Sequence, residues 1–110
     1  MKRLLAGDVR LPTAVICCSD YTAFGAMDAI REAGLSVPED ISVTGFDDLE
    51  IARYACPRLT TVRQNMEEIG RTAVERLDLM IREERSEPPA VIIPTELIIR
   101  DSCAKLQERT

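Results

Sequence analysis

The chain has 110 residues, 45% of them hydrophobic, and a formal net charge of −5. That length allows one small domain, and the low aromatic content (4%) predicts an aliphatic core. The acidic balance argues against a nucleic-acid surface on this chain, because phosphate binding needs clustered Lys and Arg. The absence of histidine excludes Ser-His-Asp and Cys-His catalysis, histidine-ligated zinc and histidine pH switching.

The first half of the chain predicts a strand–helix–strand unit. Residues 13–18 form a short apolar run that is typical of a strand buried on both faces. Ser19 occupies the N-cap position of a following helix, and Gly34 is placed to end that helix. After a turn at Pro38, residues 41–46 predict a second buried strand. Short connections of this kind imply a parallel pair with a right-handed crossover.

The second half predicts one more helix and three short strands. Residues 59–62 are rich in β-branched side chains and predict the third strand. Asn65 with Glu68 three residues later is a capping-box pattern, and the helix that it opens has apolar residues along one face. Two further strands are expected at 90–93 and 96–99.

Cysteine usage and the lack of targeting signals bear on the compartment. Cys17, Cys18, Cys56 and Cys103 form no C-x-x-C pair. Buried, reduced thiols are expected, with a structural disulfide or a reactive thiol as the alternatives. The apolar stretch at the N-terminus is too short for a signal peptide, and no stretch approaches the ~20 apolar residues that span a bilayer. We therefore expect a soluble, cytoplasmic protein without membrane contact.

Polar side chains follow three of the predicted strands. Ser19 and Asp20 follow the first, Asp47 and Asp48 the second, and Gln64 the third. In an open parallel sheet, ligands bind beyond the carboxyl ends of the strands. Carboxylates accept hydrogen bonds from hydroxyls, and an amide both donates and accepts, so a sugar or nucleoside is a suitable ligand. Helix capping and loop solvation place the same residue types at the same ends and are the alternative.

Asp47 and Asp48 also allow a second interpretation, the Mg²⁺ site of a metal-dependent α/β enzyme. Such a site usually needs more carboxylates and a Lys or Thr at a neighbouring strand end. The only two lysines, Lys2 and Lys105, lie near the termini, and the five glycines form no phosphate-binding loop. The sequence therefore favours a site without metal, cofactor or catalytic residues.

These residues lie in longer segments that resemble a known family. The segments are PTAVICCSDYTAFGAMDAIREAGLSVPEDISVTGFDD, PRLTTVRQNMEEIGRTAVERLDLMI and TELIIRDSC. VPEDISVTGFDD followed by LTTVRQ is specific to the lactose-repressor/galactose-repressor (LacI/GalR) family of transcription regulators. Residues 12–103 resemble the C-terminal portion of the members of this family.

The resemblance implies an α/β fold, a parallel-sheet fragment of the periplasmic-binding-protein-like type I fold, whose two lobes enclose a ligand cleft. Residues 1–63 and 94–103 would belong to the C-terminal lobe. Residues 64–93 would form a crossover helix and strand of the N-terminal lobe, and 104–110 a polar tail. The family's helix-turn-helix is not expected in this chain, so operator DNA would be bound only by a separate domain.

The resemblance also implies ligand contacts. In the family a small effector, often a sugar, a purine or a nucleoside, changes how tightly the regulator binds its operator. By position, Asp47 matches an acidic residue that contacts ligand hydroxyl or base groups, and Gln64 matches a cleft residue at a crossover between lobes. Ser19 stands where many members have Asn facing the ligand, and Met66 where some have an aromatic residue. Because Ser19 is shorter than Asn and Met66 cannot stack as Phe would, the effector's identity stays open.

A homodimer is the last implication of the resemblance. The surface that matches the family's dimer contact consists of Phe24, Met27, Asp28, Arg31 and the loop 51–54, which includes Arg53 and Tyr54. Phe24 and Met27 could instead face the sheet, because one helix has two apolar rims. A sugar-binding protein of a transport system has the same fold and is the alternative function.

Overall fold

The computed structural model describes residues 1–7, 10–83 and 89–106. Its contacts divide the chain into two compact units: unit 1 is Met1–Arg63 with Leu97–Thr110, and unit 2 is Gln64–Glu96. The chain thus leaves unit 1 after Arg63 and returns to it at Leu97.

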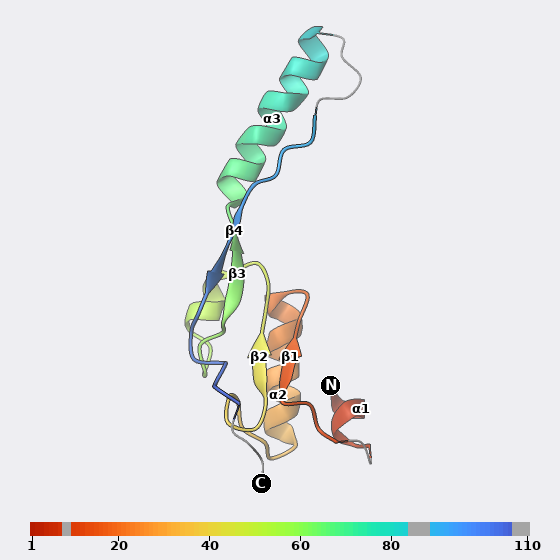
Figure 1. The fold of residues 1–110 in the computed structure, drawn as a ribbon, viewed down its shortest axis with the longest axis vertical. Coiled ribbons are helices and arrows are strands. Elements are labelled where there is room, and N and C mark those ends of the chain that lie inside the picture. The colour runs from red at the N-terminus through yellow and green to blue at the C-terminus, as the bar shows by residue number, and fades with distance from the viewer. Residues whose placement is uncertain (8–9, 84–88, 107–110) are drawn as a thin grey trace. The chain divides into compact units, whose positions relative to one another are not determined.

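Unit 1 is built around a strand–helix–strand arrangement. Its elements are α1 (Lys2–Leu5), β1 (Ala14–Ile16), α2 (Asp20–Glu32), β2 (Ser42–Thr44), the 3-10 helix η1 (Glu50–Arg53) and most of β3 (Thr61–Gln64). β1 and β2 pair in parallel, with Ala14 opposite Ser42, and α2 lies beside them (Figure 1). A parallel bridge between Thr44 and Thr60 places the segment leading into β3 next to β2. The predicted parallel α/β arrangement is confirmed.

Local signals in the sequence explain the bounds of α2. The Ser19 hydroxyl accepts a hydrogen bond from the Thr22 backbone N–H at 3.2 Å and caps the helix as predicted. Just beyond the helix, Gly34 adopts φ 74°, a left-handed conformation that favours glycine. The fully buried Ile30 anchors the helix, and such burial contributes roughly 1.5–3 kcal/mol. The core around it consists of Cys17, Ala23, Ala26, Met27, Ile30, Ile41, Val43, Ala52 and Leu59.

The prediction that the first strand is buried on both faces is wrong. Ile16 is 87% exposed and Ala14 is exposed, whereas Val15 between them packs partly against the core. Successive side chains of a strand point to opposite faces. Among the described residues, only one face of β1 is covered.

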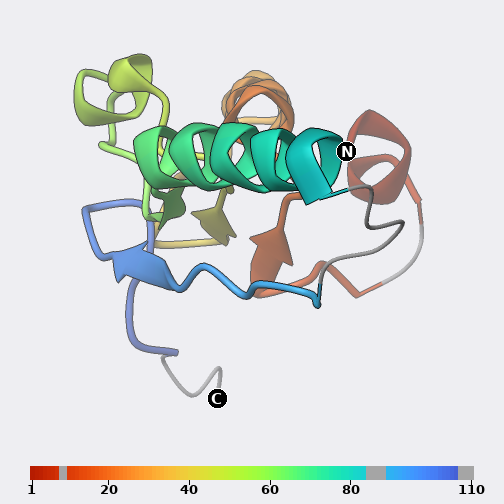
Figure 2. The same ribbon diagram turned by 90° about the horizontal axis from the view of Figure 1, so that it is seen from above.

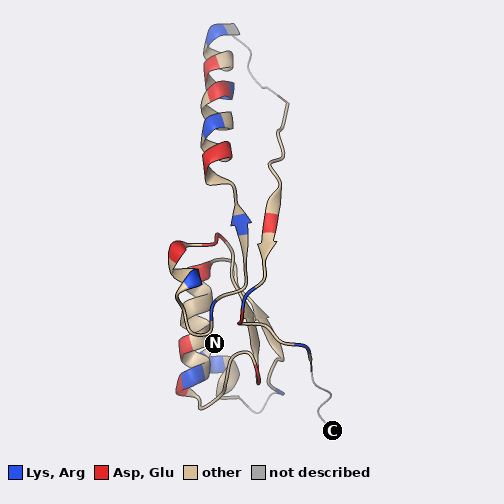
Figure 3. Ribbon diagram, turned by 90° about the vertical axis from the view of Figure 1, so that its left-hand side faces the viewer, with Lys and Arg blue, Asp and Glu red and all other residues tan. Residues whose placement is uncertain are grey.

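Unit 2 contains α3 (Met66–Glu83) and the described segment 89–96. The predicted capping box is confirmed: Asn65 Oδ1 accepts from the Glu68 N–H at 3.1 Å, and Asn65 Nδ2 donates to Glu68 Oε2 at 3.1 Å. Acidic and basic residues follow one another along α3 (Figure 3), and Arg82 pairs with Asp78 at 2.8 Å, one turn apart. β4 (Thr95–Ile98) pairs with β3 in a second two-stranded sheet.

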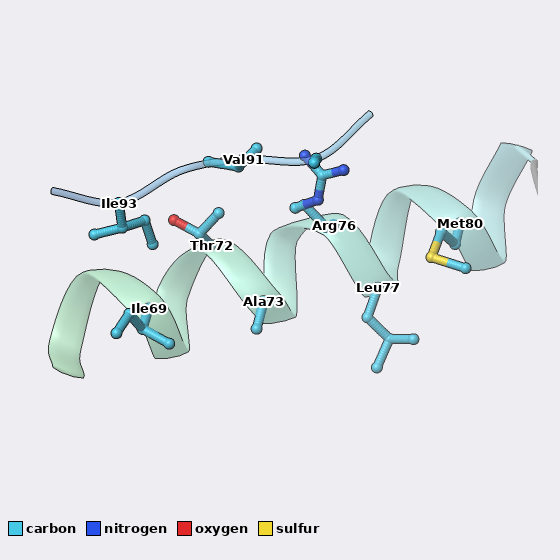
Figure 4. A pocket seen from close by; sticks show the side chains of 9 residues that line it. Ile69, Thr72, Ala73, Arg76, Leu77, Met80, Val91 and Ile93 are labelled. Carbon is cyan, nitrogen blue, oxygen red and sulfur yellow. The ribbon is translucent and has the colours of Figure 1, made fainter. Parts of the chain in front are cut away.

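The predicted strand at 90–93 is also wrong. Residues 89–94 form no strand and run alongside α3 instead, as Figures 2 and 4 show. A strand is defined by hydrogen bonds to a neighbouring strand. Within the described part of unit 2, only the helix lies beside this segment, so its apolar residues have no strand to pair with.

Candidate functional site

The segment that follows β2 has an unusual backbone. Asp47 adopts φ 115° and Asp48 adopts φ 54°, both in the left-handed region that residues other than glycine rarely occupy. The Asp47 N–H donates to the carbonyl of Val62 at 2.9 Å, which aligns this segment with β3. A strained residue costs about 1–3 kcal/mol and persists only where its surroundings impose the conformation. Such strain is often found at binding sites.

Asp20 holds both ends of the segment 46–49. Its side chain is fully buried, and its backbone N–H donates to the Phe46 carbonyl at 2.9 Å. One carboxylate oxygen accepts from the Leu49 N–H at 2.7 Å, and the other accepts from the Thr61 hydroxyl at 2.5 Å. Asp20 is therefore a structural residue at the start of α2, and the helix cap itself is Ser19.

Glycine is required just before this segment. A Cβ at Gly45 would touch Asp20 Oδ1 and would lie 2.9 Å from Cδ2 of Leu59 and 3.1 Å from Cα of Asp20. Real Cβ atoms essentially never approach another atom as closely as the two side-chain contacts require, and the 3.1 Å backbone contact is also tighter than usual, so neighbouring atoms would have to move. The close approach of β2 to the start of α2 thus depends on Gly45.

The carboxylate of Asp48 is buried and fully engaged. Its side chain is 1% exposed; Oδ2 accepts from Arg63 Nε at 2.7 Å and Oδ1 from Arg100 Nη2 at 2.6 Å. Burial alone would raise the pKa of Asp48, but hydrogen bonds and charges from Arg100 and Arg63 outweigh it and hold this pKa below its usual value. Both oxygens are thus used by guanidinium groups. No three His, Cys, Asp or Glu side chains within the described ranges are grouped so that they could hold a metal ion.

The four predicted ligand contacts fall in two places. Ser19 and Asp47 lie in unit 1, where both follow the carboxyl ends of parallel strands and where Asp20 connects their segments. The Ser19 hydroxyl is engaged in capping α2, 3.0 Å from the hydroxyl of Thr22. Gln64 and Met66 lie in unit 2, at the end of β3 and the start of α3, and Met66 is 66% exposed.

Arg100 is the part of this arrangement that sequence reasoning missed. It lies 52 residues from Asp48, so no local spacing indicates the pair. Its backbone N–H also donates to the Thr60 hydroxyl, and its guanidinium donates to the Leu59 carbonyl, each at 2.9 Å. The only signal in the sequence is an Asp–Asp pair at a strand end, which requires positive partners if one carboxylate is buried.

The predicted dimer surface divides into buried and exposed residues. Met27 is 4% exposed and belongs to the core, and Phe24 packs partly against that core. Asp28 and Arg31 are exposed and pair at 3.3 Å. In the loop 51–54, the side chain of Arg53 is 55% exposed and Tyr54 is 77% exposed.

The cysteines differ in access. All four are free; Cys18 and Cys56 are exposed, Cys103 is half-buried and Cys17 is buried. Burial raises the pKa of the Cys17 thiol, and the neighbouring Cys18 raises it further. Among the described helices, none is long and apolar enough to cross a membrane.

Unit 2 has an open apolar groove of about 550 Å³ between α3 and the segment after it (Figure 4). Its lining residues are Ile69, Thr72, Ala73, Arg76, Leu77, Met80, Ala90, Val91 and Ile93. Leu77 is 56% exposed and Val91 52% exposed. The apolar face of α3 is therefore only partly covered by the described residues of unit 2.

Known proteins provide close matches. A family model described as periplasmic binding protein-like domain matches residues 1–103. The chain is 45% identical to the HTH-type transcriptional repressor PurR of Pasteurella multocida over 102 residues, covering 93% of the chain and 30% of that protein.

Two solved structures have the same fold. A LacI family transcriptional regulator from Enterococcus faecium with bound ribose matches with a TM-score of 0.81 and 33% identity, over 96% of this chain and 38% of that one. The lac repressor dimer bound to operator and the anti-inducer ONPF matches with a TM-score of 0.76 and 39% identity, over 84% of this chain and 32% of that one. The chain thus spans about a third of the length of the proteins that it matches.

Proposed function

Because the chain belongs to the periplasmic binding protein-like family, and within it to the effector-binding domains of LacI/GalR transcription regulators, we propose that it is the effector-sensing part of a cytoplasmic transcriptional regulator. The regulator binds a small sugar or nucleoside-like ligand and acts by binding rather than by catalysis. Ligand binding shifts the population of its conformations and so changes its affinity for operator DNA. The DNA is bound by a separate helix-turn-helix domain. The proposal is supported by relatives that are named as repressors and by a related regulator with bound ribose.

The observation on which the proposal depends is the geometry at Asp47. This residue follows the carboxyl end of β2 with a left-handed backbone, while Asp20 and Asp48 hold the residues around it. A carboxylate held in a strained, over-determined segment at a strand end is suited to accept hydrogen bonds from ligand hydroxyls. We propose Asp47 as the main ligand contact, with Ser19, Gln64 and Met66 as further contacts in the full-length regulator.

Isothermal titration of the full-length regulator with D-ribose and with adenosine tests the proposal. At least one of the two should bind, and Asp47→Ala should weaken its binding about 30-fold, since a hydrogen bond to a charged group contributes roughly 2 kcal/mol. Asp78→Ala is the matched control, because it removes an exposed carboxylate that pairs with Arg82 within α3, away from the residues proposed to contact the ligand. Failure of both probes to bind, or an unchanged affinity in Asp47→Ala, contradicts the proposal.

We further propose that the regulator is a homodimer and that the loop 51–54 contributes to the contact. Tyr54 is 77% exposed and Ile51 is 55% exposed, and exposed aromatic and aliphatic side chains are frequent at the centre of protein interfaces. One related structure is a repressor dimer. Light scattering should report a dimeric mass that Tyr54→Arg reduces. Glu39→Arg, at an exposed residue of the turn after α2 and outside the predicted dimer surface, is the control and should leave the mass unchanged. A monomeric mass for the unmodified regulator would contradict this part of the proposal.

A further inference from the structure

The buried carboxylate of Asp48 joins two segments that are far apart in the sequence. Each of its oxygens accepts from a different guanidinium, Arg63 Nε at 2.7 Å and Arg100 Nη2 at 2.6 Å, and Arg53 Nη2 lies 4.0 Å away. Charge-assisted hydrogen bonds of this length are roughly twice as strong as neutral ones. Because the Asp48 side chain is 1% exposed, its charge depends on these partners, and loss of one leaves a buried charge only partly compensated.

The two arginines lie on the two passages, which are the segments where the chain leaves unit 1 and where it returns to it. Arg63 is the last residue of unit 1 before the chain enters unit 2, and Arg100 follows soon after Leu97, where the chain returns. Arg100 is itself fixed, since it donates to the Leu59 carbonyl and to the Thr60 hydroxyl at 2.9 Å each. Asp48 therefore ties both passages together on the side of unit 1.

Asp47 is held between this cluster and β3. Its N–H donates to the Val62 carbonyl at 2.9 Å, next to Arg63, and its C-terminal neighbour is the anchored Asp48. The left-handed φ of 115° thus has a restraint on each side. A change at Arg63 or Arg100 would move Asp48 and, through one peptide bond, the carboxylate of Asp47.

We infer that Asp48 is a positioning residue: by binding Arg63 and Arg100 it sets the orientation of Asp47 and couples ligand binding there to the two passages between the units. This inference rests on the proposed function, since it concerns the same site. Coupling of this kind is reciprocal, so the state of the passages affects ligand affinity as much as the ligand affects the passages.

The test measures ligand affinity, local opening and stability in the full-length regulator. With D-ribose and adenosine as probes, Asp48→Asn should weaken binding about tenfold, and Arg63→Gln should do so as well. Arg63 is 41% exposed, so its variant keeps the test usable if Asp48→Asn does not fold. Asp101→Asn is the matched control. Asp101 directly follows Arg100 in the chain and forms a 2.6 Å ion pair with Arg58, so this variant makes the same change in an ion pair that does not include Asp48.

Three results support the inference together. In the double variant of Asp48→Asn and Arg63→Gln, the two losses of affinity are less than additive, which shows that the pair acts on binding as a unit. Amide hydrogen exchange at Asp47 rises about tenfold in the single variants, as expected when opening of the segment is favoured by about 1.4 kcal/mol. The control Asp101→Asn changes neither quantity.

Other results overturn it. A folded Asp48→Asn or Arg63→Gln variant that lowers the melting temperature but binds the probe with unchanged affinity has lost only stability. An equal loss of affinity in Asp101→Asn shows a general effect of removing ion pairs. If neither probe binds the unmodified regulator, the proposed function fails. Hydrogen exchange at Asp47 then still decides whether Asp48 holds this segment in place: unchanged exchange in the variants shows that Asp48 does not position Asp47.

Discussion

The backbone of Asp47 allows a direct measurement of the strain stored at the candidate site. Alanine and glycine at this position both remove the carboxylate, so the two variants differ only in what the backbone tolerates at φ 115°. A residue with a Cβ costs about 1–3 kcal/mol in such a region. Glycine itself lowers the free energy of unfolding by roughly 0.4–1 kcal/mol, because it makes the unfolded chain more flexible. Asp47→Gly should therefore be more stable than Asp47→Ala by about 1.3 kcal/mol, the midpoint of a range from about 0 to about 2.6 kcal/mol.

Urea unfolding of both variants in the full-length regulator, followed by circular dichroism, measures this difference. Gly70→Ala in α3 provides the opposite case, since a Cβ there meets nothing within 4 Å and the backbone is helical. At that position alanine should be more stable than glycine by roughly 0.5–1 kcal/mol. If alanine at position 47 is as stable as glycine or more so, the segment is not strained and the argument from strain is refuted. Both variants at position 47 should lose ligand affinity.

Three further predictions follow from the same contacts. Gly45→Ala should lower the free energy of unfolding by about 1–3 kcal/mol, because the new Cβ would lie 3.1 Å from Cα of Asp20 and 2.9 Å from Cδ2 of Leu59; an unchanged urea midpoint would contradict this. The folded-state pKa of Asp48 is lowered, so its contribution is fully present above the unfolded pKa of about 3.9 and is lost as pH falls through the folded value. The difference in melting temperature between the regulator and Asp48→Asn should thus be constant above about pH 5 and shrink below about pH 4, and a constant difference down to pH 2 would argue against it. A thiol reagent added to the native regulator should label the exposed Cys18 and Cys56 quickly and the buried Cys17 only on unfolding. Mass spectrometry of the peptides measures the labelling, and equally fast labelling of Cys17 would contradict its burial.

Local sequence signals predicted the elements whose bounds depend on nearby residues. The cap at Ser19 and the left-handed Gly34 lie next to the ends of α2, and Asn65 and Glu68 cap α3 through contacts three residues apart. The parallel pairing of β1 with β2 was also predictable, because a short strand–helix–strand connection permits few other topologies. In each case the stabilising partner is close in sequence or fixed by chain geometry.

The wrong predictions concern burial and pairing that depend on distant parts of a fold. The apolar run at 13–18 is equally compatible with a strand covered on one face or on both, and Ile16 turned out to be 87% exposed. The run at 90–93 is apolar enough for a strand, but pairing needs a free neighbouring edge, which the described part of unit 2 does not provide. Apolar periodicity reports what a segment is able to bury and does not report what is present to cover it.

The two adjacent aspartates show which property of the site the sequence does not predict, namely the different roles of two identical side chains. Asp47 and Asp48 have the same chemistry and the same place at the end of a predicted strand, and only the resemblance to the family singled out Asp47 as a ligand contact; the residues alone left both open to a ligand or a metal. Asp48 is instead committed to guanidinium groups 15 and 52 residues away, which only the folded chain brings together. This difference predicts two distinct kinds of loss. Asp47→Ala removes the ligand contact itself, and Arg63→Gln should then cause no further loss of affinity, because Arg63 acts on binding through the position of Asp47. Asp48→Asn leaves the contact in place but displaces it, and its effect becomes smaller when Arg63→Gln is already present, since only Arg100 then still binds Asp48. A loss of affinity on Arg63→Gln that persists in the Asp47→Ala background would mean that Arg63 affects binding by another route, and the assignment of separate roles to the two aspartates would be wrong.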